Sequence, residues 1–304
     1  MQMAVSESFE SGTASTLFKL ANVNLDAFVD FLAQDPDGFP AGMDWVKDLD
    51  TFGRNWRERG ILFFPQGGGR QWRFMREAVA RHEFNPQIDC ARSLDALGMY
   101  GLRGTGFVVI NSNFYGIKDL DIRNLSKFEL HAQQMCYYVA DFLKAKVPGF
   151  ENACVAHVGV DLGIRSSRYI RGRAVLQGGD IQDAPAPKRC DDVIATTPVQ
   201  DTKAEGGSFF KPFASDVPFG VTVPKGCRNL LVGSAKSIST RPRAIIRGMS
   251  GCMVCGQAAG AAGALGAKSG IPCADVPIRD LQRELLRQGV QLGDEKRLQE
   301  LGLA

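Results

Sequence analysis

The chain has 304 residues, of which 44% are hydrophobic and 23% charged, so it can bury one large core or two moderate ones and is not expected to be disordered. Its 36 basic and 33 acidic residues leave a formal net charge of +3, and no long basic run occurs. The charge therefore indicates neither nucleic acid nor anionic lipid as a partner, and we expect a protein that handles small molecules.

The eight cysteines are scattered with one close pair, which is typical of free thiols in a reducing compartment. The opening segment, MQMAVSESFESGTAS, has neither the basic nor the apolar region of a signal peptide. We therefore expect a cytoplasmic protein. The uncharged run at residues 248–267 has the length of a membrane span, but it is rich in Gly and Ala and poor in Leu, Ile and Val, so we do not expect it to cross a bilayer.

In chain order, the first marked element is a helix after Asn24, where LDAFVDFLA places apolar residues at helical spacing behind a capping residue. A second short helix is expected in RQWRFMREAVARH. The glycine triplet 67–69 before it predicts a turn rather than a phosphate loop, because no Lys-Ser/Thr follows. Segment 106–113 is rich in β-branched residues and predicts a strand. The next helix is predicted to begin at a capping box, Ser126–Glu129, and to end near Val147.

Residues 153–176 predict two strands joined by a turn that contains arginines. Residues 178–218 are rich in Gly, Pro, Asp and Lys without clear periodicity, so a long surface segment is expected there. The NLLVG segment, residues 229–233, predicts a short buried strand. A closing helix is expected from about Pro277.

The segment RGMSGCMVCGQAAGAAGALGAKSG, residues 247–270, predicts a helix with a bare backbone face. Four glycines fall on one side at steps of four, three and three: Gly256, Gly260, Gly263 and Gly266. Each glycine costs about 1 kcal/mol relative to alanine in a helix interior, so such a helix needs close packing in return.

The first turn of this helix, Ser250–Met253, is expected to present unpaired backbone N–H groups and the positive end of the helix dipole. A phosphate would suit this position, as would a carbonyl that becomes anionic on reduction. The alternative is a helix end that meets only water or a neighbouring side chain.

Cys252 and Cys255 would lie on one face of the same helix. A zinc or iron–sulfur site normally needs four ligands, and the sequence has no second Cys-x-x-Cys and only three scattered histidines, so we expect no metal. A redox dithiol at the helix N-terminus is an alternative to two small buried hydrophobic residues.

Three ordered segments, GIRSSRYIRGRAVL, VPKGCRNLLVG and RGMSGCMVCGQAAGAAGAL, resemble the C-terminal portion of FAD-dependent oxidoreductases labelled xanthan-lyase-like or heterodisulfide-reductase-subunit-A-like. Two earlier segments, STLFKLANVNLDAFVDFL and LSKFELHAQQMCYYVADFLKAKVPGFENA, are similar to the middle region of that family. The resemblance implies an α/β chain with a partial FAD-binding fold, Rossmann-like and glutathione-reductase-like, joined to an α+β region. We expect a substrate or cap region at 1–150, the C-terminal part of the FAD-binding domain at 151–275, and a C-terminal helical extension at 276–304.

The resemblance also implies roles for individual residues. The cofactor-binding positions that match the motifs are Gly233, Ser234, Ser250, Gly251, Cys252 and Gly256. The catalytic candidates are Arg247, as a charge near flavin or substrate, and Arg165 and Arg168, as anchors for an anionic substrate.

The sequence departs from the family pattern in three places. The Gly-x-Gly-x-x-Gly turn that holds the ADP half of FAD does not precede STLFKL, the segment after NLLVG is one residue longer, and STRPRAIIRG lacks the histidine of Thr-His-Glu. The fold is therefore expected to lack its N-terminal dinucleotide-binding unit, with a separate polypeptide supplying it.

The function implied is FAD-dependent hydride transfer between a small organic substrate and flavin, with neither nucleic acid nor membrane as a partner. A non-catalytic accessory subunit or a truncated remnant of such a flavoprotein is the alternative. A thiol–disulfide enzyme that uses the cysteine pair is the third interpretation.

Overall fold

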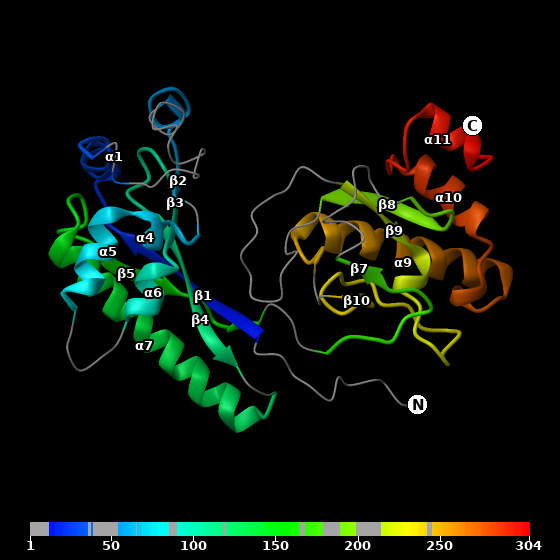
Figure 1. Ribbon diagram of the computed structural model, residues 1–304, viewed down its shortest axis with the longest axis horizontal. Coiled ribbons are helices and arrows are strands. Elements are labelled where there is room, and N and C mark those ends of the chain that lie inside the picture. The colour runs from blue at the N-terminus through cyan, green and yellow to red at the C-terminus, as the bar shows by residue number, and fades with distance from the viewer. Residues whose placement is uncertain are drawn as a thin grey trace. The chain divides into compact units, whose positions relative to one another are not determined.

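The computed structural model describes residues 12–35, 38, 54–64, 66–84, 90–117, 120–164, 168–178, 189–198, 214–241 and 245–304. The chain divides into an N-terminal unit, residues 10–164, and a C-terminal unit that begins at residue 165. Both units contain helices and strands, so the expected mixture of the two is confirmed (Figure 1).

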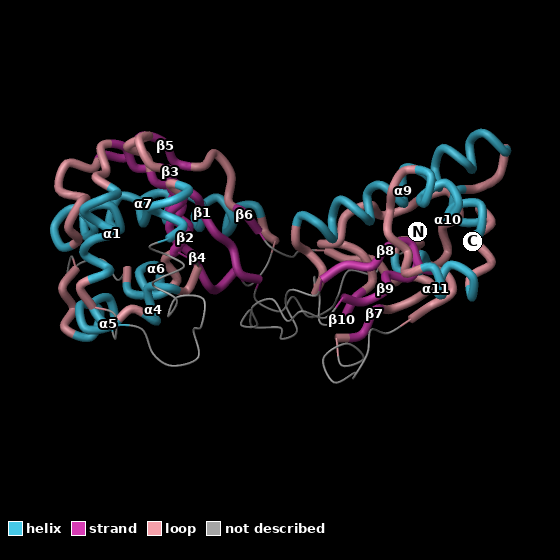
Figure 2. Tube along the Cα trace, turned by 90° about the horizontal axis from the view of Figure 1, so that it is seen from above, coloured by secondary structure: helices cyan, strands magenta, loops and turns pink. Residues whose placement is uncertain are grey.

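The N-terminal unit is built on an antiparallel sheet with the strand order β2-β3-β4-β1-β5 (Figure 1). β6 also pairs with β1 (Figure 2). The strands are β1 Gly12–Ala21, β2 Ile61–Phe64, β3 Gly98–Leu102, β4 Val108–Ile117, β5 Cys154–Val158 and β6 Gly163–Ile164. β4 confirms the strand predicted from segment 106–113. Buried residues alternate with exposed or half-buried ones along β1, as expected for a strand with one face on a core.

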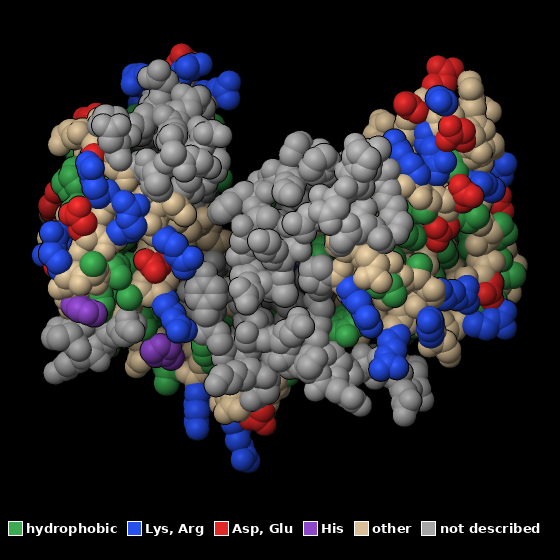
Figure 3. All heavy atoms as spheres, viewed as in Figure 1, with side chains coloured by type: hydrophobic (Ala, Val, Ile, Leu, Met, Phe, Trp, Pro, Cys, Tyr) green, Lys and Arg blue, Asp and Glu red, His purple; other side chains and the backbone are tan. Residues whose placement is uncertain are grey.

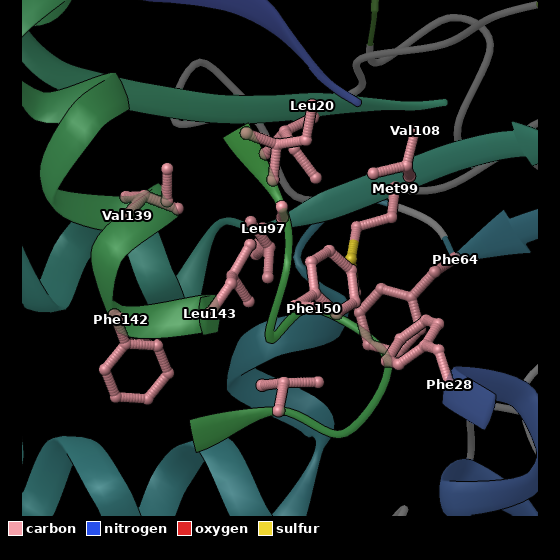
Figure 4. Close-up of a cluster of buried hydrophobic side chains, with 14 of the residues drawn as sticks. Leu20, Phe28, Phe64, Leu97, Met99, Val108, Val139, Phe142, Leu143 and Phe150 are labelled. Atoms are coloured by element: carbon pink, nitrogen blue, oxygen red, sulfur yellow. The ribbon is translucent and has the colours of Figure 1, made fainter. Parts of the chain in front are cut away.

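One face of this sheet is covered by helices. They are α1 Leu25–Ala33, α4 Gly68–Gln71, α5 Arg73–Ala80, α6 Ala91–Asp95 and α7 Ile122–Lys146, and a π-helical turn spans Asn55–Arg59. Side chains from sheet and helices form one core, whose centre contains Phe28, Phe64, Met99 and Phe150 (Figure 4). The rings of Phe28 and Phe150 meet edge to face with centroids 5.3 Å apart.

The predicted caps have different outcomes. Asn24 caps α1 as expected, because its side chain accepts a hydrogen bond from the Ala27 N–H. The capping box predicted at Ser126 is wrong. α7 begins one turn earlier, where the Asp121 side chain accepts from the N–H groups of Arg123 and Asn124, and the Ser126 hydroxyl donates to the Ile122 carbonyl inside the helix.

The C-terminal unit contains the Gly/Ala-rich helix predicted from the sequence, α9 Met249–Ser269, which runs beside a β-hairpin (Figure 2). The hairpin strands are β8 Val193–Pro198 and β9 Ala214–Pro218; β7 Leu176–Gln177 and β10 Thr240–Arg241 form a short parallel pair. The remaining helices are α10 Ile278–Arg287, α11 Glu295–Glu300, and 3-10 turns at Phe219–Val221 and Cys273–Asp275. α10 confirms the predicted closing helix.

Two predictions for this unit are wrong. Residues 178–218 contain the β8–β9 hairpin rather than only a surface segment, and the buried Asp216 carboxylate holds it by accepting from the Thr196 hydroxyl, the Arg189 guanidinium and the Cys190 N–H. Residues 229–233 are not a strand, and Leu230 is exposed. The described part of the chain places no strand beside that segment, whose Val232 N–H donates to the Thr222 carbonyl.

Basic and acidic side chains both occur on each unit on the face shown in Figure 3, in keeping with the small net charge of +3. Within the described residues, no helix combines the length and the hydropathy that a membrane crossing requires.

Candidate functional site

The N-terminus of α9 has no side-chain cap. Its N-cap residue is Gly248, and no acidic residue lies in the first turn. The Cys252 N–H donates to the Gly248 carbonyl at 2.9 Å, so the N–H groups that helix geometry leaves without an intrahelical acceptor belong to Met249, Ser250 and Gly251. Met249 and Ser250 are exposed. This end of the helix can therefore bind a group that carries negative charge, because donors and dipole both face it.

The start of α9 depends on glycine at position 251. A methyl group built there would overlap the carbonyl oxygen of Ile246, so the chain can fold back tightly before the helix only because residue 251 has no side chain. Gly251 is buried, whereas its neighbour Ser250 is exposed. The glycine thus shapes the helix end that the sequence had indicated as a binding position.

Two other predicted cofactor-binding residues meet directly. A methyl group built on Gly233 would lie 3.2 Å from the Gly256 Cα, and one built on Gly256 would lie 3.3 Å from the Gly233 carbonyl oxygen. Ser234 then begins a tight turn, since its carbonyl accepts from the N–H groups of Ser237 and Ile238 at 2.9 and 3.2 Å. The structure therefore brings the NLLVG segment against the second turn of α9.

The prediction that four glycines of α9 form its packed face is wrong in part. Methyl groups built on Gly260 and Gly263 would meet nothing within 4 Å, whereas one built on Gly266 would lie 2.8 Å from the Ile271 carbonyl. The face that packs is made instead of buried small residues at helical spacing: Gly251, Cys255, Ala258, Ala261, Ala262 and Gly266. Small side chains, rather than bare backbone, provide most of the contact.

The arginine candidates are spread over the C-terminal unit. Arg247 is half-buried two residues before α9, and its carbonyl accepts the Cys252 thiol at 3.4 Å. Arg168 is exposed, in a segment whose Ile170 N–H donates to the Ser237 carbonyl, so the segment runs beside the turn that begins at Ser234. Arg165 lies outside the described residues.

The two thiols of the Cys-x-x-Cys pair differ in exposure, because Cys252 is half-buried at the start of α9 whereas Cys255 lies in the core. Cys255 is fully buried, and burial raises the pKa of its thiol to about 12, which strongly disfavours the reactive thiolate. A group of three or more His, Cys, Asp or Glu side chains that could hold a metal is absent from the described ranges.

Sequence reasoning missed one residue of the helix end. It placed the first turn at Ser250, whereas the helix begins at Met249. Gly248 was the available signal, because glycine is accepted at the N-cap position.

A family model described as FAD dependent oxidoreductase matches residues 6–285 of the chain. No curated protein and no solved structure matched the chain. The matched range includes the N-terminus of α9, Gly233 and all three arginine candidates.

Proposed function

The chain belongs to the family of FAD-dependent oxidoreductases, whose cofactor is FAD, and from this premise we propose that it acts in hydride transfer between a small organic substrate and the flavin. When bound, FAD would accept or donate the hydride at its N5 atom, and negative charge would develop at the pyrimidine edge of its ring. The observation that carries the proposal is the uncapped N-terminus of α9. The three ordered motifs support a place near the xanthan-lyase-like and heterodisulfide-reductase-subunit-A-like members.

The described residues fit the ring end of the cofactor. The N–H groups of Met249, Ser250 and Gly251 would stabilise negative charge on the pyrimidine edge, because hydrogen bonds to charged groups are stronger than neutral ones. The close approach of Gly233 to Gly256 keeps the backbone beside this helix free of side chains. Arg247 would add a positive charge near the site, and Arg165 and Arg168 would anchor an anionic substrate. We assign no general base.

The ADP end of the cofactor has no comparable site in the sequence, which contains no Gly-x-Gly-x-x-Gly turn. We propose that a separate polypeptide supplies this turn and completes a Rossmann-like, glutathione-reductase-like sheet. The short parallel pair β7–β10 supports this proposal, since further parallel strands would extend it into such a sheet. The proposed functional division at residues 150 and 275 stays a proposal, and the compact N-terminal unit extends beyond the first boundary to residue 164, because β5 and β6 belong to its sheet. We also propose a cytoplasmic location, which the eight free cysteines support.

Replacement of Ser250 tests the role of the helix end. In the flavin-loaded complex of this chain with its ADP-binding partner, Ser250→Pro removes one N–H from the first turn, where proline is compatible with the helix. The loss of one hydrogen bond to a charged group is worth about 1.5–3 kcal/mol. For a two-electron couple this lowers the flavin reduction potential by about 30–60 mV.

Ser250→Ala is the matched control, because it keeps the N–H and changes only an exposed side chain. We expect its reduction potential to equal that of the wild-type complex. Equal potentials for the proline and alanine variants would show that the helix end does not contact the flavin. A partner-bound chain without flavin would instead favour the non-catalytic accessory subunit.

A further inference from the structure

The face of the N-terminal sheet that the helices leave open carries a single row of side chains across five strands. The strand registers pair Phe63 with Tyr100, Tyr100 with Val109, Val109 with Lys19, and Lys19 with His157. The row thus has two aromatic rings at the β2–β3 end, and the Lys19 ammonium and the His157 imidazole at the β1–β5 end. The Phe63 and Tyr100 rings contact each other with centroids 5.4 Å apart.

Apolar side chains surround the aromatic end of this row. Ile61 on β2 and Leu102 on β3 are opposite each other, two residues along each strand from Phe63 and Tyr100 and on the same face. Ile61, Leu102 and Phe63 are 41%, 57% and 54% exposed. A large contiguous apolar patch on a protein surface usually marks a binding site. The face of the sheet opposite its hydrophobic core is therefore partly apolar and exposed.

The other end of the row is polar and positively charged. The Lys19 ammonium lies 5.3 Å from the centre of the Phe107 ring, and no ion pair of Lys19 occurs within the described ranges. The exposed His157 is its cross-strand neighbour. Two residues after Val109 on β4, the Asn111 amide oxygen accepts a hydrogen bond from the Gln66 amide at 3.3 Å. An ammonium group beside the Phe107 ring, with no carboxylate partner among the described residues, is suited to an external anion.

We propose that this open face binds an organic carboxylate with an aromatic or extended apolar body. The carboxylate lies at Lys19 and His157, and the apolar body lies over Val109, Tyr100 and Phe63. An apolar surface with a few placed polar groups is the usual composition of a small-molecule site. The identification of this ligand as the substrate rests on the proposed flavoenzyme function, whereas its binding to the sheet does not.

Charge favours this occupant over a second copy of the chain. A two-fold related copy would bring a second Lys19 and a second His157 into the same interface. The row of described residues contains no carboxylate that could neutralise the Lys19 ammonium groups. A carboxylate ligand supplies the missing charge and covers the rings at the same time.

Calorimetric titration of the flavin-free chain with naphthalene-2-carboxylate tests the proposal, with uncharged 2-naphthylmethanol as the paired probe. The carboxylate is expected to bind at least tenfold more tightly than the alcohol. Lys19→Gln is expected to weaken carboxylate binding about tenfold while leaving the alcohol unaffected. Tyr100→Ala is expected to weaken both probes severalfold.

Lys127→Gln and Leu130→Ala are the matched controls, because both residues are exposed on α7. Neither is expected to change binding of either probe. Equal affinity for the two probes, or an equal loss in Lys19→Gln and Lys127→Gln, would overturn the proposal. Self-association that Phe63→Ser abolishes, without carboxylate binding, would overturn it in favour of a dimer interface. Because no flavin is present, failure of the flavoenzyme proposal leaves these results unchanged.

Discussion

Gly251 and Gly260 occupy the same helix but meet opposite surroundings. A side chain at Gly251 would overlap the Ile246 carbonyl, whereas one at Gly260 would meet open space. Gly251→Ala is therefore expected to lower the free energy of unfolding by about 1–3 kcal/mol, the usual cost of overpacking. Gly260→Ala is expected to raise it by up to about 1 kcal/mol, because alanine is the better helix former.

Urea denaturation of the two variants measures both effects. Equal changes in the unfolding midpoint would contradict the tight fold-back before α9. A stabilised Gly251→Ala variant would contradict it as well.

The cysteine pair of α9 provides a second test at the scale of residues. The pKa of Cys255 is raised to about 12 by burial, so at pH 8 its thiol stays protonated. Iodoacetamide is expected to modify the exposed Cys154 well before Cys255 in the folded protein. Peptide mapping by mass spectrometry measures the order of labelling. Rapid labelling of Cys255, or an activity that disappears in the double alanine variant at 252 and 255 while flavin is retained, would favour the thiol–disulfide interpretation.

At the scale of elements, local signals predicted the helices well. The Asn24 cap and the apolar spacing after it specify α1, and the Gly/Ala stretch specifies α9 as a helix. The start of α7 was misplaced because two capping residues compete within two turns. Asp121 is the N-cap because its carboxylate accepts hydrogen bonds from two backbone N–H groups of the first turn. Ser126 lies inside the helix, where its hydroxyl donates to the Ile122 carbonyl instead.

Alanine variants at these two positions check the start of α7. Asp121→Ala is expected to destabilise the protein by about 1 kcal/mol, the usual cost of losing an N-cap. Ser126→Ala is expected to be neutral or slightly stabilising, since alanine is preferred in a helix interior. Thermal unfolding compares them, and a larger loss for Ser126→Ala would place the helix start at the capping box.

Contacts distant in sequence decided the elements that were missed. β8 and β9 form around Asp216, whose partners Arg189, Cys190 and Thr196 have no periodic pattern that a sequence window could detect. The NLLVG segment has the composition of a buried strand, but a strand also needs a neighbour to pair with, and the described residues provide none. The helix end of the candidate site was predictable from Gly and Ala content, whereas the fold-back at Gly251 required the position of Ile246.

At the scale of the whole molecule, each unit has its own hydrophobic core. The N-terminal core joins one sheet face to the helices that cover it, and the C-terminal core joins α9 and α10 to short strands and turns. The exposed features that the proposals use are the open sheet face and the uncapped end of α9.

The absorption spectrum of the chain, purified alone and together with a candidate ADP-binding partner, tests this account most directly. Flavin bands in the near-ultraviolet and blue are predicted for the co-purified complex, and they should bleach when a reductant is added. A stable complex that remains colourless, with a chain that is also colourless alone, would contradict the claim that the N-terminus of α9 serves a flavin.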